Sequence, residues 1–276
     1  MPVRGVDFLS VGFWNVEKHT SVTLDENAPL GYRAPDSTQY LIDQIMDWYR
    51  LSKFDILIMA EVPDAKGKGD AFAQTIANRI NTIGFPRPGM RGGFRWSETR
   101  EQRKSVCNFA YVWDEEVDGL AGLGGRTDFV WLPDHARPMI EMNAGRAVIG
   151  GIHAKAANHE AAMRQIVDCC GELEGWKKPA VLIGDMNVGF KSIPAQDKML
   201  LNSMGWEAVP PGLAETHRSR NPRYKPKVLD YIWRGDLAGT VEATPPFDPY
   251  MWWQENDHAP IQYTIAFGAQ DDPMEL

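Results

Sequence analysis

The chain has 276 residues, of which 43% are hydrophobic and 24% are charged, a composition typical of a globular protein with a large core. Its formal net charge of −8 argues against loose, sequence-independent adhesion to nucleic acid or anionic lipid, although a phosphodiester substrate stays compatible with local basic segments. The apolar runs are too short to span a membrane. Without internal repeats or a linker rich in Pro, Gly or Ser, we expect one domain over residues 1–276, with an acidic tail from about residue 270.

The cysteines and the first residues bear on the cellular compartment. Cys107, Cys169 and Cys170 form an odd set, and two adjacent cysteines do not easily bridge to each other. The first residues lack the apolar stretch and the small-residue cleavage site of a signal peptide. We therefore expect a cytoplasmic protein, although a secreted chain with its signal trimmed would look the same.

Apolar periodicity in the first third of the chain predicts strands that alternate with helices. Strands are expected over Phe8–Val16 and Phe54–Ala60, where apolar residues run almost without interruption. Ser37 resembles a helix N-cap, and the helix after it should reach Tyr49. A second helix is expected over Ala71–Ile83, where large apolar residues recur at helical spacing.

The rest of the chain is richer in β-structure. We expect strands over Val106–Trp113, Phe129–Leu132, Pro138–Met142, Arg146–His153, Ala180–Ile183, Val228–Trp233 and Ile261–Phe267. Asn143-Ala144-Gly145 has the composition of a hairpin turn, and helices are expected over Asn158–Glu174 and Ala195–Met204. This order predicts an α/β fold in which two packed mixed sheets are flanked by helices, with loops gathered at one edge.

Four short segments, far apart in the sequence, place polar side chains at or just beyond the ends of apolar runs. They are Phe-Trp-Asn-Val-Glu at 13–17, Ile-Met-Ala-Glu at 58–61, Gly-Asp-Met-Asn at 184–187 and Asn-Asp-His at 256–258. Strands that end at the same edge of a sheet would bring these side chains together. The set combines hard oxygen ligands, a candidate base and hydrogen-bond donors, which suits metal-assisted cleavage of a phosphate ester.

The oxygen donors in these segments predict a divalent-cation site. Mg²⁺ prefers one or two carboxylates, an amide oxygen and retained waters. We expect Asn15, Glu17, Glu61 and Asp257 to hold Mg²⁺ or Mn²⁺. A single Glu after a strand is more often a solvated loop residue, and Glu17, next to Lys18, would also fit a position that faces water.

Asp185 and Asn187 follow the strand that ends near Ile183. On extended backbone, residues two apart lie on the same side. An ionised Asp185 would then orient or deprotonate an attacking water, and Asn187 would donate to a phosphate oxygen. The alternative interpretation is an Asx turn that ends the strand.

A second acid–base pair is expected at Asp230 and His258. As an imidazolium, His258 would face the charged phosphorus centre, and this role needs an acidic partner. Asp230 is the natural candidate because a carboxylate within a strand is unfavourable unless it is paired, although it could instead bond to backbone. We also place His153, which closes a strand, in the site. The remaining histidines are interpreted as satisfied core or rim residues: His19, His135, His159 and His217.

These motifs resemble those of the endonuclease/exonuclease/phosphatase superfamily, which includes deoxyribonuclease I, exonuclease III-type repair enzymes, phosphoinositide phosphatases and sphingomyelinases. The resemblance runs in order from Phe8 to Ile261. It implies a four-layer α/β sandwich and Mg²⁺-dependent phosphoesterase chemistry. It also implies that Asp185 is the water-orienting base, Asn187 a phosphate ligand, and Asp230 with His258 a catalytic pair.

Within the superfamily, the segments around Arg137-Pro138 and His153-Ala154 are most similar to the active subunit of cytolethal distending toxin and to deoxyribonuclease I. In that branch His153 would be the general acid and Arg137 a phosphate contact, and Asn108 is expected to join the substrate-binding residues. The branch carries a Glu that orients this histidine. Here Cys107 occupies the aligned position, and Glu101 is a candidate substitute from the preceding loop.

Together these features predict a Mg²⁺- or Mn²⁺-dependent phosphodiesterase, and specifically a DNA endonuclease. One alternative is a phosphomonoesterase that acts on phosphoinositides or other small phosphates. Another is a non-catalytic binding module on the same scaffold. For a nuclease, Arg137 and the basic segments 91–104 and 218–227 should border the site as two banks of a groove.

Overall fold

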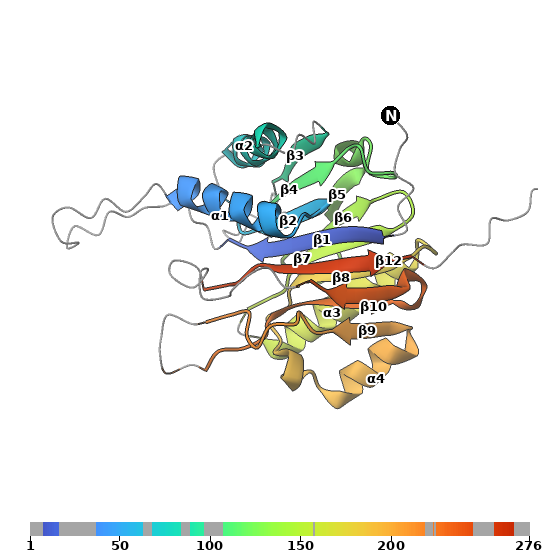
Figure 1. Ribbon diagram of the computed structural model, residues 1–276. Coiled ribbons are helices and arrows are strands. Elements are labelled where there is room, and N and C mark those ends of the chain that lie inside the picture. Colours follow the sequence, from blue (N-terminus) through green and yellow to red (C-terminus); the bar gives the residue numbers. More distant parts are fainter. Residues whose placement is uncertain are drawn as a thin grey trace, which may run out of the picture.

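The computed structural model describes residues 8–16, 37–62, 68–83, 89–96, 107–156, 158–218, 223, 225–244 and 257–267. Within these ranges the chain forms two six-stranded sheets that pack face to face, and helices cover the outer face of each sheet (Figure 1). Both sheets are mixed, because each contains one parallel pair among antiparallel ones. The expected α/β four-layer sandwich is therefore confirmed.

The first sheet has the strand order β11-β12-β1-β2-β4-β3. Its strands are β1 (Phe8–Asn15), β2 (Ile56–Ala60), β3 (Met90–Arg95), β4 (Phe109–Asp114), β11 (Thr240–Ala243) and β12 (Ile261–Ala266). Helices α1 (Ser37–Leu51) and α2 (Lys68–Thr82) cover its outer face. Strand β3 needs glycine at this contact, because a Cβ on Gly92 would lie 2.5 Å from the backbone of Ala73 in α2.

The second sheet has the strand order β5-β6-β7-β8-β10-β9. Its strands are β5 (Thr127–Val130), β6 (Met139–Asn143), β7 (Val148–His153), β8 (Ala180–Asp185), β9 (Trp206–Val209) and β10 (Asp230–Gly235). Its outer face is covered by α3 (His159–Glu174) and α4 (Ala195–Ser203). Short 3₁₀ helices span Leu123–Arg126, Phe190–Ser192 and Asp236–Ala238.

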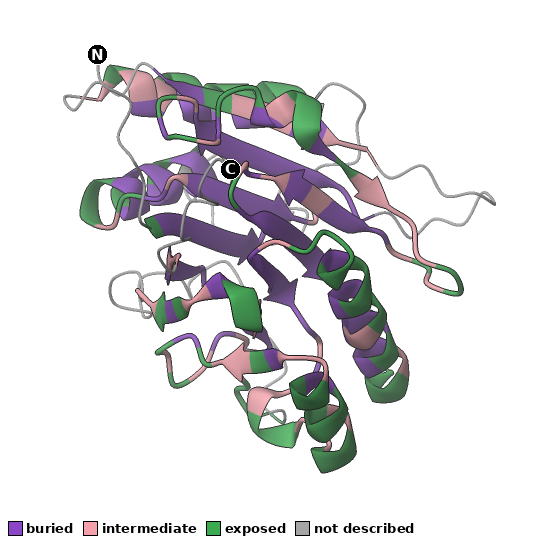
Figure 2. Ribbon diagram, turned by 90° about the vertical axis from the view of Figure 1, so that its right-hand side faces the viewer, coloured by how far each residue is buried: buried purple, intermediate pink, exposed green. Residues whose placement is uncertain are grey.

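The alternation of side chains along the strands separates an inner core from two outer ones. In β8, Val181 and Ile183 belong to the core between the sheets, whereas Leu182 packs beneath the helices. Figure 2 shows the consequence: the strands are mostly buried, and the helices expose their outer sides. Because Asp185 follows Val181 and Ile183 at the same spacing, the inner row of β8 ends in a carboxylate.

Other inner rows end in polar residues in the same way. The row of β1 that contains Val11 and Phe13 ends at Asn15, and β7 ends at His153, directly beside Asp185 in the β7–β8 register. Strand β10 begins at Asp230, which pairs with Asp185 on its other side. Alternation therefore delivers four polar side chains to one edge, between the two sheets.

Most expected elements are present, with bounds that differ by a few residues, and three strands were missed. The hairpin turn before β7 is confirmed: Gly145 has a φ of 73°, and its N–H donates to the side chain of Asn143. Strands β9 and β11 are four-residue edge strands, and β3 contains Gly92-Gly93, so their sequences carry little strand signal. The side chain of Ser37 lies outside the described residues, so its expected capping bond stays a prediction. No helix in the described part of the chain is long and apolar enough to cross a membrane.

Candidate active site

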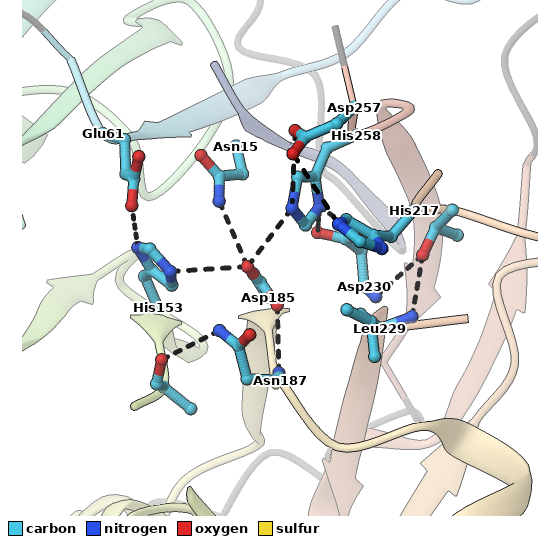
Figure 3. Close-up of polar contacts among 12 residues, drawn as sticks. Asn15, Glu61, His153, Asp185, Asn187, His217, Leu229, Asp230, Asp257 and His258 are labelled. Atoms are coloured by element: carbon cyan, nitrogen blue, oxygen red, sulfur yellow. Dashed lines mark hydrogen bonds and ion pairs between the residues drawn. The ribbon is translucent and has the colours of Figure 1, made fainter. Parts of the chain in front are cut away.

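Asp185 lies at the centre of the polar cluster where the edges of the two sheets meet (Figure 3). Its Oδ2 accepts a hydrogen bond from Asn15 Nδ2 at 3.1 Å, across the sheet interface. The same oxygen lies 3.4 Å from His153 Nε2 and 3.6 Å from His258 Nε2. The Oδ2 atom of Asp185 thus faces three residues, which come from β1, from β7 and from the loop before β12.

The second oxygen of Asp185 is also held. Oδ1 accepts the backbone N–H of Asn187 at 2.9 Å. Burial of Asp185 alone would raise its pKa, but the neighbouring His258 and His153, with the hydrogen bonds from Asn187 and Asn15, outweigh burial and lower it. Asp185 is therefore an oriented, ionised carboxylate at neutral pH.

His258 and Asp230 form the expected pair. Nδ1 of His258 lies 2.9 Å from Oδ2 and 3.1 Å from Oδ1 of Asp230, which confirms the predicted contact. Burial would lower the pKa of His258, but the carboxylates of Asp230 and Asp185 outweigh it and raise the pKa to about 10. Burial raises the pKa of Asp230 to about 6, against the opposing effect of His258. At neutral pH the pair is therefore an imidazolium and a carboxylate.

Two further contacts fix the position of this pair. The indole N–H of Trp14 donates to the carbonyl of His258 at 2.9 Å. The hydroxyl of Thr216 accepts the backbone N–H groups of Leu229 and Asp230, each at 2.9 Å, at the start of β10. The backbones of His258 and Asp230 are thus held by separate side chains.

Nε2 of His153 faces Asp185, and its other ring nitrogen, Nδ1, faces the carboxylate of Glu61. Its Oε1 lies 3.1 Å from His153 Nδ1. Glu61 follows β2 with a φ of 56°, a left-handed conformation that is unfavourable for a residue other than glycine. Cys107, at the position that the resemblance assigns to an orienting Glu, is a buried thiol whose pKa is raised to about 12 by burial. The suggested substitute Glu101 lies outside the described residues, and within them Glu61 is the carboxylate that faces His153 Nδ1.

The expected metal donors occupy the rim of the cluster. Figure 3 shows Glu61 and Asp257 on either side of Asn15, whose amide oxygen points away from Asp185. The side chains of Glu61 and Asp257 are 20% and 16% exposed, whereas that of Asp185 is only 2% exposed. Two partly exposed carboxylates and an amide oxygen match the donor types that Mg²⁺ prefers. Glu17 lies outside the described residues.

Asn187 departs from the extended conformation assumed from the sequence. Strand β8 ends at Asp185, and Asn187 has a left-handed φ of 49°. The turn forms because the Asp185 carboxylate accepts the Asn187 N–H, which is the Asx turn considered as the alternative. The Asn187 side chain donates to the carbonyl of Ala154 at 2.9 Å. Its contact with phosphate stays a prediction.

Arg137 and Asn108 both lie beside the strand ends. The guanidinium of Arg137 donates from Nη1 to the carbonyl of Ala154 at 2.9 Å and to that of His153 at 3.3 Å, so it supports the end of β7. Asn108 is fully buried just before β4, where its carbonyl accepts the N–H of Val62. Direct contacts of Arg137 and Asn108 with a substrate stay predictions.

The two basic segments differ in their relation to the site. Arg91 pairs in register with Trp113, toward the end of β4 away from Glu61, and forms an ion pair with Glu115. The expectation that the whole segment 91–104 borders the site is therefore wrong for Arg91, and residues 97–104 lie outside the described ranges. Arg218 does border the site, because its backbone N–H donates to the carbonyl of Asp257 at 2.8 Å.

His217 was interpreted as a core or rim residue, and it lies at the rim of the site, against His258. Its ring lies 4.7 Å from that of His258, centroid to centroid, and its Nε2 lies 3.7 Å from Asp257 Oδ2. The contact arises through an isolated bridge between loops, for which sequence spacing gives no signal. In contrast, His135 forms an ion pair with Asp168 and retains its interpretation as a rim residue.

Comparisons with known proteins give a match in structure and none in sequence. No family model matches the chain, and no curated protein matches it. Truncated TDP2 from Caenorhabditis elegans aligns over 95% of this chain and 98% of that chain, at 12% identity and a TM-score of 0.60. The 3′ phosphatase NExo from Neisseria, bound to a product DNA hairpin, aligns over 94% and 99%, at 13% identity and a TM-score of 0.57.

A third solved structure names the family that the motifs resemble. It is an endonuclease/exonuclease/phosphatase family protein from Bacteroides thetaiotaomicron, which aligns over 95% of this chain and 96% of that chain, at 12% identity and a TM-score of 0.56. Identities this low establish the fold rather than a substrate. This chain therefore has the fold of the endonuclease/exonuclease/phosphatase superfamily.

Proposed function

We propose that this protein is a divalent-metal-dependent phosphodiesterase and that it cleaves DNA as an endonuclease. The observation that carries the proposal is the position of Asp185. Its Oδ2 faces Asn15, His153 and His258, and its Oδ1 is held by the backbone of Asn187. A carboxylate oriented on both oxygens and flanked by two imidazoles suits the activation of water beside a phosphate ester.

In this proposal Asp185 orients an attacking water in line with the leaving oxygen and accepts its proton. Its lowered pKa keeps it ionised at neutral pH, so the carboxylate is available as an acceptor. The hydrogen bonds from Asn15 and Asn187 hold the carboxylate before the substrate arrives. Such preorganisation lowers the barrier because the groups need not be ordered during the reaction.

His258 supplies positive charge where negative charge develops on the phosphoryl oxygens. With a pKa raised to about 10, its ring is an imidazolium at neutral pH, and Asp230 fixes the ring through Nδ1. Asn187 would add a neutral donor from the adjacent turn. His153 would protonate the leaving oxygen, with Glu61 facing its other nitrogen.

A divalent cation completes the proposed site. Glu61, Asn15 and Asp257 would hold Mg²⁺ or Mn²⁺, which would polarise a phosphoryl oxygen as a Lewis acid. An all-oxygen donor set favours these ions over softer ones. Within this donor set, Glu61 serves both the cation and His153.

The preference for DNA rests on the charges beside the site. Arg218 is joined to Asp257 through the backbone, and Lys227 pairs with the neighbouring His217, so part of the basic segment lies next to the proposed cation donors. Arg137 lies beside His153, at the end of β7. A duplex needs contacts to several phosphates, whereas a small head group needs one compact pocket. NExo, a protein of the same fold, was solved with a product DNA hairpin.

A side-by-side assay tests this proposal. Supercoiled plasmid, RNA and inositol phosphates are each incubated with the protein in Mg²⁺ and in EDTA. We expect nicking of the plasmid in Mg²⁺ and none in EDTA. Turnover of inositol phosphates alone would favour a phosphomonoesterase. Binding of plasmid without turnover of any substrate would favour a non-catalytic binding module.

A further inference from the structure

His217, Asp257 and His258 form a cluster that the proposed reaction uses only in part. Asp257 faces both rings from one side: its Oδ2 is 3.7 Å from His217 Nε2, and its Oδ1 is 3.8 Å from His258 Nε2 (Figure 3). Each of the three residues offers one ligand atom, and these atoms all lie within 4.8 Å of one another. His217 has no role in the proposed hydrolysis.

We propose that these three residues form an inhibitory transition-metal site that binds Zn²⁺. Zn²⁺ binds readily to two imidazole nitrogens and one carboxylate, whereas Mg²⁺ prefers oxygen donors and reluctantly sheds its waters. The cluster therefore differs in donor type from the proposed Mg²⁺ donors, although it shares Asp257 with them.

The distances agree with this assignment. Tetrahedral coordination with bonds of about 2.0–2.1 Å places neighbouring ligand atoms roughly 3.4 Å apart. The distances of 3.7 Å from His217 Nε2 to Asp257 Oδ2 and 3.8 Å from His258 Nε2 to Asp257 Oδ1 are a few tenths of an ångström longer and involve the two different carboxylate oxygens. Small rotations of the side chains would close this difference.

The surroundings of the two rings also match a metal site. Imidazoles that bind a metal commonly give their other nitrogen to a carboxylate, and Nδ1 of His258 lies 2.9 Å from Asp230. The position of His217 is set by its backbone, which exchanges hydrogen bonds with Lys227 at 2.9 and 3.0 Å. Asp185 and Asp230 add negative charge near His258, and this charge favours a divalent cation.

His217 supplies a second imidazole ligand, and this distinguishes the cluster as a site for Zn²⁺. Among the described residues, the other group with metal-compatible geometry consists of Asp185, Asp230 and His258, all buried, and contains one imidazole only. Cys107, Cys169 and Cys170 are buried, and burial raises the pKa of each thiol, so none of them offers an accessible thiolate.

Zn²⁺ at this position would block the proposed reaction. Coordination to Nε2 of His258 displaces the proton of that nitrogen to solvent, and the ring then no longer donates to a phosphoryl oxygen. Asp257 would at the same time be withdrawn from the Mg²⁺ donors. This inhibition rests on the proposed function, whereas the binding of Zn²⁺ does not.

Binding is tested by calorimetric titration of the full chain with ZnCl₂ in the presence of Mg²⁺. His217→Phe keeps a ring against His258 but removes the ligand nitrogen, and His217→Asn is a second, smaller variant. We expect one Zn²⁺ per chain in the wild type and at least tenfold weaker binding in both variants. His159→Asn, an exposed histidine at the start of α3, is the matched control and should bind as the wild type does. Co²⁺, followed by the visible absorption of tetrahedral sites, gives an independent readout.

Inhibition is then measured as the Zn²⁺ concentration that halves Mg²⁺-dependent plasmid cleavage. His217→Phe should cleave within about twofold of the wild-type rate without Zn²⁺ and should need at least tenfold more Zn²⁺ for inhibition. Unchanged Zn²⁺ affinity in both folded His217 variants would overturn the proposed site. Tight binding that depends on His217 but leaves cleavage unaffected would overturn the inhibition. If no substrate is cleaved at all, the proposed function fails, and the calorimetric comparison still decides whether the site exists.

Discussion

Two buried polar clusters lie on opposite faces of the first sheet and differ in charge. On the outer face, Trp48 Nε1 of α1 donates to Gln262 Oε1 of β12 at 2.7 Å, and Gln262 Nε2 donates to Ser10 Oγ at 2.7 Å. On the inner face, at the edge, Asp185 and Asp230 surround His258. The outer cluster is neutral, and the inner cluster is built from ionisable groups.

The difference indicates which cluster performs the reaction. In the neutral cluster the indole N–H of Trp48 and the amide N–H of Gln262 each meet an acceptor, so burial of these groups leaves little electrostatic penalty. In the charged cluster, burial raises the pKa of Asp230 to about 6, while the surrounding carboxylates raise that of His258 to about 10. Large pKa shifts of this kind among buried neighbours are typical of functional sites. We therefore expect the neutral cluster to contribute to stability alone and the charged cluster to perform the reaction.

The largest effect is expected from loss of the cation. EDTA, or Glu61→Gln, should abolish plasmid cleavage, because the proposed Mg²⁺ site loses either its ion or a carboxylate ligand. The free energy of unfolding of Glu61→Gln in urea should stay within about 1 kcal/mol of wild type, since Glu61 lies at the partly exposed rim. Glu160→Gln, at an exposed position of α3, is the control for loss of a carboxylate. Undiminished cleavage in EDTA would disprove the metal assignment.

Removal of His258 should lower both the turnover rate and the free energy of unfolding. His258→Ala should lower turnover by about a hundredfold or more, because a positioned positive charge is lost. It also leaves Asp230 buried without its imidazolium, so stability should fall by about 3–5 kcal/mol. The variant itself should be less stable at pH 8 than at pH 5. The folded-state pKa of Asp230 is already raised, so at low pH the carboxyl binds a proton and the buried charge disappears.

Unfolding in urea at the two pH values, with cleavage measured on folded protein, checks the His258 prediction. Equal stability of the variant at both pH values would show that Asp230 does not carry an uncompensated charge. Near-wild-type turnover in a folded variant would remove His258 from the proposed mechanism.

A substitution in the neutral cluster should lower stability without changing cleavage. Gln262→Leu leaves the Trp48 N–H and the Ser10 hydroxyl without this partner, and each buried polar group left unsatisfied costs about 1–3 kcal/mol. Urea unfolding should therefore show a clear loss of stability, with cleavage per folded molecule unchanged. Gln39→Leu, at an exposed position of α1, should change stability by less than about 0.5 kcal/mol. A large loss of activity in folded Gln262→Leu would break the separation between the two clusters.

The smallest effect on cleavage is expected from replacement of Arg137, which supports the end of β7 and is also a predicted phosphate contact. Arg137→Ala should weaken plasmid cleavage and reduce the slope of its salt dependence by about one, with less effect on a small chromogenic phosphodiester. Because Arg137 also supports the carbonyls of His153 and Ala154, Arg137→Lys serves as a control that retains the charge. Equal losses on both substrates would place the bound phosphate at the reacting centre and favour a small-molecule substrate.

The site was predictable wherever a residue continued a strand pattern. Asp185 ends the buried run of β8 and Asn15 ends that of β1, so alternation alone placed them at the sheet edge. The pairing of Asp230 with His258 followed from the penalty on an unpaired buried carboxylate. These inferences need only local periodicity and the chemistry of burial.

Features set by tertiary contact were not predictable in this way. The ion pair of Glu61 with His153 joins the ends of β2 and β7, which lie in different sheets. His217 reaches His258 through a bridge between loops. Strand β3 forms despite Gly92-Gly93 because α2 and the Tyr111 ring pack closely against these glycines. None of these contacts leaves a periodic signal in the sequence.

The most direct test of the central claim is the rate at which Asp185→Asn nicks supercoiled plasmid in saturating Mg²⁺, compared with wild type. The substitution keeps the size of the side chain and its place beside Asn15 and Asn187, and it removes the charge that would accept a proton from water. We predict measurable Mg²⁺-dependent nicking by wild type and a rate lower by a factor of about a hundred or more for the folded variant. A folded Asp185→Asn protein that nicks plasmid at the wild-type rate would contradict the proposed mechanism.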